Sequence, residues 1–132
     1  MRVVILGCGR VGAYLAKMLV AEGHQVAMID QNRVAFARLG PSFPGDLVVG
    51  TGIDEDVLRK AGIEQADAFV AGAYGDNTNI MAAQVVKEIF DVPKVVCQIY
   101  DPLLEEIYRN LELETVCPTI LRATKIKEAL DR

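Results

Sequence analysis

Three glycines stand near the start of the chain in the order Gly7-x-Gly9-x-x-Gly12, directly after the apolar run 2–6. In this spacing the first glycine permits a tight turn off a strand, the second lets the backbone approach a pyrophosphate, and the third lets a helix pack closely on the strand. A helix that begins here presents unpaired N–H groups and the positive end of its dipole to an anion. The pattern therefore predicts a phosphate-binding loop at the start of a βαβ unit.

An acidic residue, Asp30, closes the next apolar run, residues 25–29. An acid at the end of the second strand of such a unit accepts hydrogen bonds from ribose hydroxyls, and its charge repels a 2′-phosphate. The combination favours NAD(H) over NADP, while ATP, ADP and AMP, which carry the same adenosine phosphate, stay open as alternatives. A Walker-type phosphate loop is excluded, because Ala13 and Tyr14 stand where its Lys and Ser/Thr are required.

Other side chains near this loop could also do chemistry. We expect the Arg10 guanidinium to sense the number of ligand phosphates through charge-assisted hydrogen bonds, the alternative being a solvated residue of the first helical turn. Cys8 is interpreted as a position that demands a small side chain, with a reactive thiolate at the helix N-terminus as the alternative. The only histidine, His24, is expected to face solvent in a turn, and the three scattered cysteines predict reduced thiols.

Size and composition limit the class of protein. The 132 residues, 52% hydrophobic and 24% charged, suffice for one globular core but not for two domains of usual size. The net charge of −4 offers no basic surface for nucleic acid or an anionic membrane. No run approaches the ~18 apolar residues of a spanning helix, and the chain begins with a strand pattern rather than a signal peptide. We therefore expect one cytoplasmic domain.

Apolar runs alternate with helical patterns along the whole chain. Strands are predicted at about 2–6, 25–29, 46–50, 68–71, 94–99 and 114–117, with helices between them and a last helix from 118 onward. Asp76 and Asp101 are expected to cap helices, and the acids at 54–56 to form a cap and first turn rather than a metal cluster. This alternation predicts an α/β fold, a Rossmann-like doubly wound six-stranded parallel sheet, with its crevice at the carboxyl ends of strands one, two and four.

Several helices carry more apolar surface than one sheet can cover. The helix at 76–90 is apolar round most of its circumference, and Leu103 lies outside the stripe of the following helix, which comprises Leu104, Ile107, Tyr108 and Leu111. The last helix adds the face Ile120, Ala123, Ile126 and Leu130. Because monomers rarely expose such patches, we expect at least a dimer.

Five segments share their spacing with one known family. The loop reads G-x-G-R-x-G, Ile29-Asp30 is followed by Arg33, and residues 54–68 read D-x-x-x-L-x-x-A-G-I-x-x-A-D-A. Asp76-x-x-Asn79 and Ile99-x-Asp101-Pro102 supply the other two. Together they resemble, over nearly the whole chain, the nucleotide-binding lobe of the RCK or KTN (TrkA-N) family, cytosolic regulators of potassium uptake systems and channels.

Three features depart from the family pattern. The segment Gly50-Thr51-Gly52 lacks the acid that the family usually carries after its third strand. Cys97-Gln98 stands where the family often has Ala-Arg, so a second basic contact to ligand phosphate is missing. The family's smaller C-terminal ligand lobe has no counterpart in these residues, so we expect a lone lobe or one that works with a partner subunit.

The resemblance implies that residues 1–132 form one RCK/KTN lobe, of which 118–132 are a terminal crossover and dimerisation helix. It implies a non-enzymatic regulatory subunit that binds NAD(H), or alternatively ATP/ADP or AMP. Through a homo-oligomer, from a dimer to an octameric ring, alone or with a second RCK subunit, it would gate a potassium-translocating membrane subunit of the Trk or Ktr type. It would then lie in the cytoplasm against the inner face of the cell membrane, with no nucleic-acid partner.

An NAD-dependent oxidoreductase is the alternative function. Hydride transfer needs a substrate pocket and an acid or base near the nicotinamide, but the chain has no second domain, a misplaced histidine and no Tyr-x-x-x-Lys. The cofactor-binding residues that we expect are Gly7, Gly9, Arg10, Val11, Gly12, Asp30, Gln31, Arg33, Thr51, Gly52, Ile53, Ala71, Gly72, Ala73 and Asn79. No catalytic or metal-binding residue is expected.

Overall fold

The computed structural model describes all 132 residues, and its six strands form one parallel sheet in the order β3-β2-β1-β4-β5-β6. The strands are β1 (Arg2–Leu6), β2 (Gln25–Asp30), β3 (Asp46–Val49), β4 (Ala68–Ala71), β5 (Lys94–Gln98) and β6 (Glu114–Val116). The chain starts in the middle of the sheet, runs to one edge through β2 and β3, and then returns to place β4 beside β1. The order therefore reverses between β1 and β4, and the predicted Rossmann-like doubly wound sheet is confirmed.

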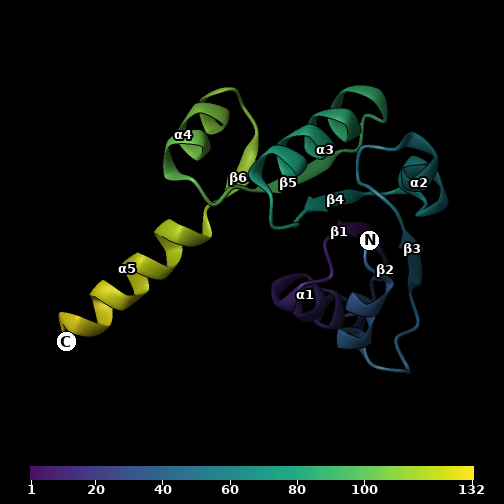
Figure 1. Ribbon diagram of the computed structural model, residues 1–132, viewed down its shortest axis with the longest axis horizontal. Helices are drawn as coiled ribbons and strands as arrows, with labels where there is room; N and C mark the ends of the chain where they lie inside the picture. Colours follow the sequence, from purple (N-terminus) through teal and green to yellow (C-terminus); the bar gives the residue numbers. More distant parts are fainter.

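Helices lie on both faces of this sheet (Figure 1). One face is covered by α1 (Arg10–Ala21) and by η1 (Arg33–Leu39), a 3₁₀ helix. The other face is covered by α2 (Glu55–Lys60), η2 (Ile63–Gln65), α3 (Asp76–Ile89) and α4 (Pro102–Asn110). The inner strands β1, β2 and β4 are thus largely buried, as parallel strands require, whereas the edge strands β3 and β6 stay largely exposed.

The central strand β1 shows why its sequence is continuously apolar. Val3 and Ile5 belong to the apolar layer beneath α1 and η1, whereas Val4 and Leu6 belong to the layer beneath α2 and α3. Successive side chains of a strand point to opposite faces, so a strand buried on both faces needs an apolar residue at every position. All four side chains are buried.

Two of the predicted acidic caps are confirmed. The side chain of Asp54 accepts hydrogen bonds from N–H groups in the first turn of α2, and that of Asp101 does the same at α4. Pro102 follows Asp101 as the first residue of α4, where its missing N–H costs no helical hydrogen bond. Glu55 and Asp56 follow in the first turn of α2, where negative charge suits the positive end of the helix dipole.

The predicted capping role of Asp76 is wrong. The N-cap of α3 is Gly75, which has no side chain to accept a hydrogen bond from the first turn. The Asp76 carboxylate instead accepts hydrogen bonds from the backbone N–H groups of Tyr100 and Asp101, at 2.7 and 3.0 Å. This acid therefore joins the start of α3 to the loop that follows β5.

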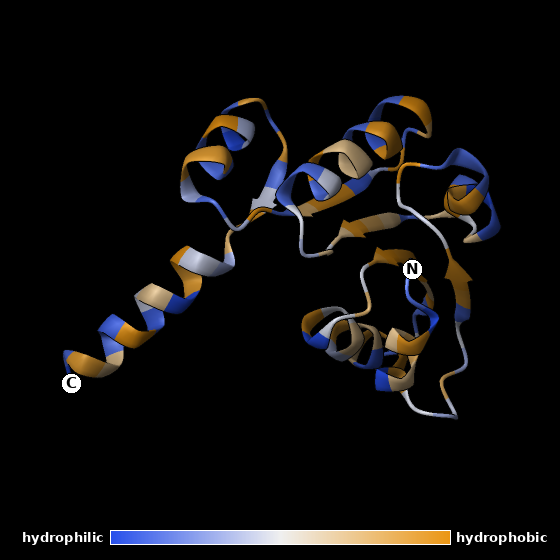
Figure 2. Cartoon of the chain, viewed as in Figure 1, coloured by the Kyte–Doolittle hydropathy of each residue, from blue (hydrophilic) through white to orange (hydrophobic).

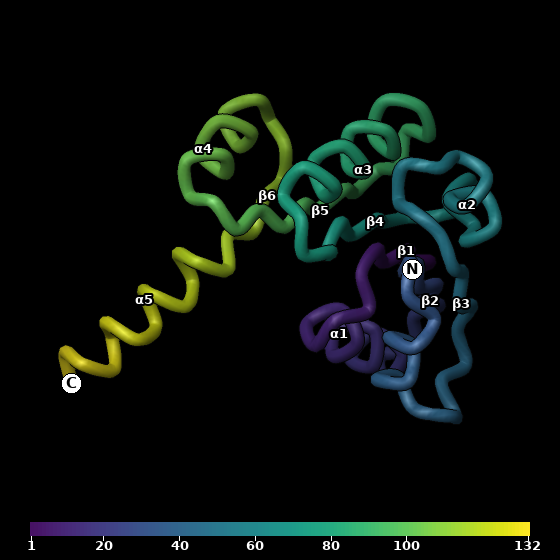
Figure 3. The backbone as a smooth tube through the Cα atoms, viewed as in Figure 1, coloured from purple at the N-terminus to yellow at the C-terminus, as the bar shows by residue number.

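The final helix α5 (Pro118–Leu130) extends away from the sheet (Figure 1), and Figure 3 shows the backbone turning outward directly after β6. None of its residues is buried. Apolar positions alternate with polar ones along its length in Figure 2, and Leu130 is 79% exposed. No helix of the structure combines the length and the apolarity that crossing a bilayer requires.

The predicted stripe of α4 is only partly correct. Leu104 and Tyr108 pack against the core, but Ile107 and Leu111 stay exposed. The one buried residue of α4 is Glu105, whose carboxylate accepts a hydrogen bond from the Thr115 hydroxyl at 2.6 Å. The apolar pattern failed to predict this because the partner of Glu105, Thr115, lies on the neighbouring strand β6, and helical spacing does not reveal such a partner.

Candidate functional site

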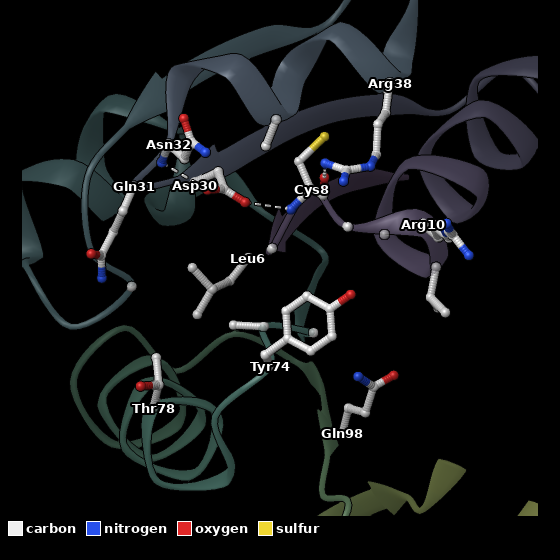
Figure 4. Close-up of a pocket in the computed structure, with 18 of the residues that line it drawn as sticks. Leu6, Cys8, Arg10, Asp30, Gln31, Asn32, Arg38, Tyr74, Thr78 and Gln98 are labelled. Carbon is white, nitrogen blue, oxygen red and sulfur yellow. Dashed lines mark hydrogen bonds between the residues drawn. The ribbon is translucent and has the colours of Figure 1, made fainter.

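A cavity of about 700 Å³ lies at the carboxyl ends of β1, β2 and β4, where the strand order reverses (Figure 4). This is the position at which doubly wound sheets bind their ligands, and it agrees with the crevice predicted from the sequence. The wall consists of residues that follow these strands together with residues from η1, α3, the end of β5 and α5. Its members are Leu6, Gly7, Cys8, Gly9, Arg10, Val11, Gly12, Asp30, Gln31, Asn32, Ala35, Arg38, Gly52, Gly72, Ala73, Tyr74, Thr78, Gln98, Tyr100 and Arg122.

The three loop glycines are required for different reasons. Gly7 has φ +101°, and a Cβ there would lie 2.6 Å from the carbonyl oxygen of Gly72. A Cβ at Gly12 would lie 2.0 Å from the carbonyl oxygen of Gly7, so a side chain there would push α1 off β1. A Cβ at Gly9 would meet nothing closer than the Tyr74 ring at 3.8 Å, which leaves this backbone open toward the cavity.

Asp30 is fixed by two backbone hydrogen bonds, both drawn in Figure 4. Its Oδ2 accepts from the N–H of Cys8 at 2.8 Å, and its Oδ1 accepts from the N–H of Asn32 at 2.8 Å. Each carboxylate oxygen can accept more than one hydrogen bond, so the half-buried Asp30 retains acceptor capacity toward the cavity. Its position in the wall suits a ligand that carries neighbouring hydroxyl groups.

The wall is electrostatically positive. It contains the guanidinium groups of Arg10, Arg38 and Arg122, while Asp30 is its only carboxylate. Arg38 donates a hydrogen bond to the carbonyl oxygen of Cys8 at 3.3 Å. The side chains of Arg10 and Arg122 take part in none of the hydrogen bonds or ion pairs of the structure. An anionic ligand would therefore find two uncommitted cations at this cavity.

Two tyrosines, Tyr74 and Tyr100, belong to the cavity wall. The rings of Tyr74 and Tyr100 are stacked, with centroids 6.5 Å apart and planes 14° apart. The Tyr100 hydroxyl accepts a hydrogen bond from Nε2 of Gln98 at 2.8 Å. In Figure 4 the Tyr74 ring stands between the glycine loop and Gln98, and its side chain is 80% exposed.

The thiolate alternative for Cys8 is wrong. Burial raises the pKa of the Cys8 thiol, and the charge of Asp30 raises it further, against smaller opposing effects from Arg38 and Lys17. The thiol is therefore protonated near neutral pH, and Cys8 serves as a small buried side chain between two glycines. All three cysteines are buried free thiols, and His24 is a partly exposed turn residue bonded to the N-terminal amine.

Ten of the fifteen predicted site residues lie in the cavity wall. They are Gly7, Gly9, Arg10, Val11, Gly12, Asp30, Gln31, Gly52, Gly72 and Ala73. The other five lie outside it: Arg33, Thr51, Ile53, Ala71 and Asn79. Each of the five is next to a wall residue in the sequence, but the cavity does not reach it; Ala71 is buried in the core of the sheet, for example, and Ile53 is 43% exposed.

Asn79 lies behind the cavity wall, in the interior of the protein. It is fully buried, and its Oδ1 accepts from the N–H of Ala73 at 2.8 Å. Its Nδ2 donates to the carbonyl oxygens of Ala73 and Gln98, at 2.7 and 2.9 Å. Because both bonded segments contribute to the cavity wall, Asn79 shapes the site from behind rather than facing into it.

Ten wall residues were not predicted: Leu6, Cys8, Asn32, Ala35, Arg38, Tyr74, Thr78, Gln98, Tyr100 and Arg122. Cys8 and Asn32 could have been found from their places beside Gly7 and Asp30. No sequence pattern points to Arg38, which reaches the glycine loop because η1 packs next to it. Tyr100 and Arg122 come from distant segments, and no local pattern indicates that they meet the loop.

A doubly wound parallel sheet with a glycine-lined cavity at its switch point and an acid at the end of β2 defines a Rossmann-like domain. Within this class the chain belongs to the TrkA-N domain family, which matches residues 3–119.

Individual relatives agree with this assignment. The chain is 53% identical over 116 residues to the Trk system potassium uptake protein TrkA of Streptomyces coelicolor, covering 88% of this chain and 52% of that protein. It thus spans about half the length of the curated relatives that it matches first.

Solved structures share the fold. The Kef CTD of Shewanella denitrificans in its AMP-bound form superposes with a TM-score of 0.85 at 20% identity, covering 99% of this chain and 80% of that chain. The GsuK channel bound to NAD gives a TM-score of 0.73 at 20% identity, covering 89% of this chain and 21% of that chain.

Proposed function

We propose that the chain is the nucleotide-binding part of a regulatory protein of a potassium uptake system or channel. The observation that carries this proposal is the cavity in which the glycine loop and Asp30 are joined by the hydrogen bond from the Cys8 N–H. Support comes from the TrkA-N family and from a relative at 53% identity that is named a Trk system potassium uptake protein.

The ligand that we propose is an adenine nucleotide, NAD(H) first, with ATP/ADP or AMP as alternatives. The glycine loop offers the N-terminus of α1 to a phosphate, and Asp30 offers acceptors to ribose hydroxyls. A 2′-phosphate would meet the charge of Asp30, so NADP is disfavoured. The fold-related structures were solved with AMP and with NAD, which is consistent with either choice.

The proposed mechanism is regulation by assembly. Leu103, Ile107 and Leu111 on α4 are more than half exposed, as are Met81 and Ile89 on α3, and α5 buries no residue at all. We propose that these faces build a homo-oligomer, from a dimer to an octameric ring, alone or with a second RCK subunit, in which 118–132 act as the crossover and dimerisation helix. The ligand must bind two shapes of the assembly with different affinity, because a ligand with equal affinity for both would not change their relative populations.

The proposed partner is a potassium-translocating membrane subunit of the Trk or Ktr type, so the assembly would work in the cytoplasm at the inner face of the cell membrane. Catalysis is not part of the proposal. The Asp30 carboxylate, the only one in the wall, is assigned to ligand hydroxyls, and the Cys8 side chain is fully buried, so neither is assigned a proton-transfer role. An NAD-dependent oxidoreductase would instead oxidise NADH when offered carbonyl substrates.

The direct test is mass spectrometry of the small molecule retained by the purified protein, combined with light scattering. We expect an adenine nucleotide and a mass of at least twice the 14.4 kDa of the chain. Oxidation of NADH with a carbonyl substrate would favour the oxidoreductase. A strictly monomeric mass that nucleotide does not change would remove the assembly on which the gating mechanism depends.

A further inference from the structure

We infer that Arg122, on α5, is a second phosphate-binding residue, and that a bound nucleotide thereby fixes the direction of α5. The inference rests on the proposed function, because it needs a phosphorylated ligand in the cavity. It assigns the ligand a contact outside the doubly wound sheet.

The position of Arg122 is the first observation. From Thr119 to the end of the chain every residue is exposed, yet Arg122 forms part of the cavity wall. Its guanidinium has no ion-pair partner, whereas Lys125 pairs with Glu128 at 3.4 Å in the same helix. A cation that is uncommitted and reaches a cavity has the chemistry to receive an anion.

The charge of the surrounding wall is the second observation. Arg10 is uncommitted where α1 meets the cavity, and Arg122 is uncommitted where α5 meets it; the wall also contains the uncharged Gln98 and Tyr100. The first phosphate of a nucleotide would lie at the glycine loop, where the N–H groups of α1 point. Further phosphates would extend across the cavity, and Arg122 is the free cation on that side.

The attachment of α5 is the third observation. The Thr119 hydroxyl donates to the carbonyl oxygen of Tyr100 at 2.7 Å, and the Cys117 thiol makes a long contact with the same oxygen at 3.6 Å. Beyond this point no residue of α5 is buried against the body. A helix of 13 residues is about 20 Å long, so a contact made in its first turns redirects its far end.

Together these observations describe how a bound ligand would attach α5 to the cavity wall. Tyr100 forms part of the cavity wall and also holds the start of α5, and a polyphosphate between Arg10 and Arg122 would add a second attachment one turn further along. Since α5 carries exposed apolar residues such as Ile126 and Leu130, its direction decides where a second copy can dock. The number of phosphates on the bound ligand thus determines the direction of α5, the helix on which a second copy docks.

The test compares Arg122→Gln with Lys125→Gln, which removes the same charge from the same helix outside the cavity wall. Calorimetric titration with AMP, ADP and ATP should show that Arg122→Gln binds ATP about tenfold more weakly than wild type, with a smaller loss for AMP. Lys125→Gln should keep the wild-type affinities. Hydrogen exchange should show that ATP protects residues 118–124 in wild type and in Lys125→Gln but not in Arg122→Gln.

Three results would contradict the inference, and they differ in what they mean for the proposed function. If wild type binds ATP and Arg122→Gln binds it equally well, Arg122 does not contact the ligand and the inference is wrong, while the proposed function stands. The inference is also wrong if Lys125→Gln loses as much affinity as Arg122→Gln, because the effect is then one of general charge. If wild type binds none of the three nucleotides, this inference is wrong, and the proposed function fails as well only if NADH does not bind either.

Discussion

The backbone N–H of Cys8 donates a hydrogen bond to Oδ2 of Asp30 at 2.8 Å, so the glycine loop after β1 and the acidic end of β2 form one bonded unit. The same carboxylate that would recognise ribose therefore also holds the loop that would recognise phosphate. If an adenosine phosphate binds as we propose, recognition of its two halves would be coupled through a single side chain.

Replacing Asp30 by Ala should weaken nucleotide binding by about 1 to 3 kcal/mol, the usual effect of losing hydrogen bonds to a charged group. Asp67→Ala is a matched control, because Asp67 also accepts from a backbone N–H, that of Arg2 at 2.8 Å, but lies away from the cavity wall. Calorimetric titration measures both. Equal affinity in wild type and Asp30→Ala would remove Asp30 from the site.

Glycine substitutions should separate folding from binding. Gly12→Ala should unfold the protein or lower its melting temperature sharply, because the new Cβ would lie 2.0 Å from a backbone oxygen. Gly9→Ala should change the free energy of unfolding by no more than about 1 kcal/mol, because its Cβ makes only ordinary contacts, yet it should abolish tight nucleotide binding. Thermal melts and titrations check the pair; a Gly9→Ala protein that binds normally would mean that no pyrophosphate approaches Gly9.

Asn79→Ala should destabilise the fold by about 2 to 4 kcal/mol, because it leaves buried backbone groups of Ala73 and Gln98 without partners. Asn77→Ala, next to Thr78 and exposed on the same turn, should have little effect. Urea unfolding distinguishes the two variants. Similar unfolding midpoints would contradict the structural role assigned to Asn79.

Stability should depend on Cys97 at alkaline pH. Burial, and secondarily the charge of Asp76, raises the pKa of the Cys97 thiol from 9.0 to about 12. Above pH 9 the unfolded chain releases this proton while the folded protein keeps it, so the stability that Cys97 contributes is present below pH 9 and is lost as pH rises toward 12. Relative to Cys97→Ala, the wild-type free energy of unfolding should fall by up to about 1.4 kcal/mol per pH unit in this range. If the free energies of unfolding of the two proteins changed with pH in parallel, this role of Cys97 would be contradicted.

The parts of the structure that depend on local spacing were predictable. Each of the six strands follows from its own apolar run, and the glycine loop and Asp30 follow from the pattern of the first βαβ unit. The connections between parallel strands leave little choice of handedness. Asp76 was misread as a cap because the N–H groups that it accepts from lie after β5, and the buried hydrogen bonds of Asn79 to Ala73 and to Gln98 at the end of β5 could not be foreseen from local spacing.

Direction and distance explain the remaining differences in the site. Arg33 and Arg38 stand at opposite ends of η1, and only Arg38 bonds to the glycine loop, through the carbonyl oxygen of Cys8. Arg122 reaches the cavity because of the path that the chain takes after β6, which no composition or periodicity encodes.

The central claim, that the cavity binds an adenine nucleotide, is tested most directly by calorimetric titration of the purified protein with NADH, AMP, ADP and ATP, using Gly9→Ala as the folded control. We predict that at least one of these ligands binds wild type with one molecule per chain, and that Gly9→Ala loses this binding while its melting temperature stays within about 5 °C of wild type. Absence of binding by all four ligands at millimolar concentration, or equal binding by wild type and Gly9→Ala, would contradict it.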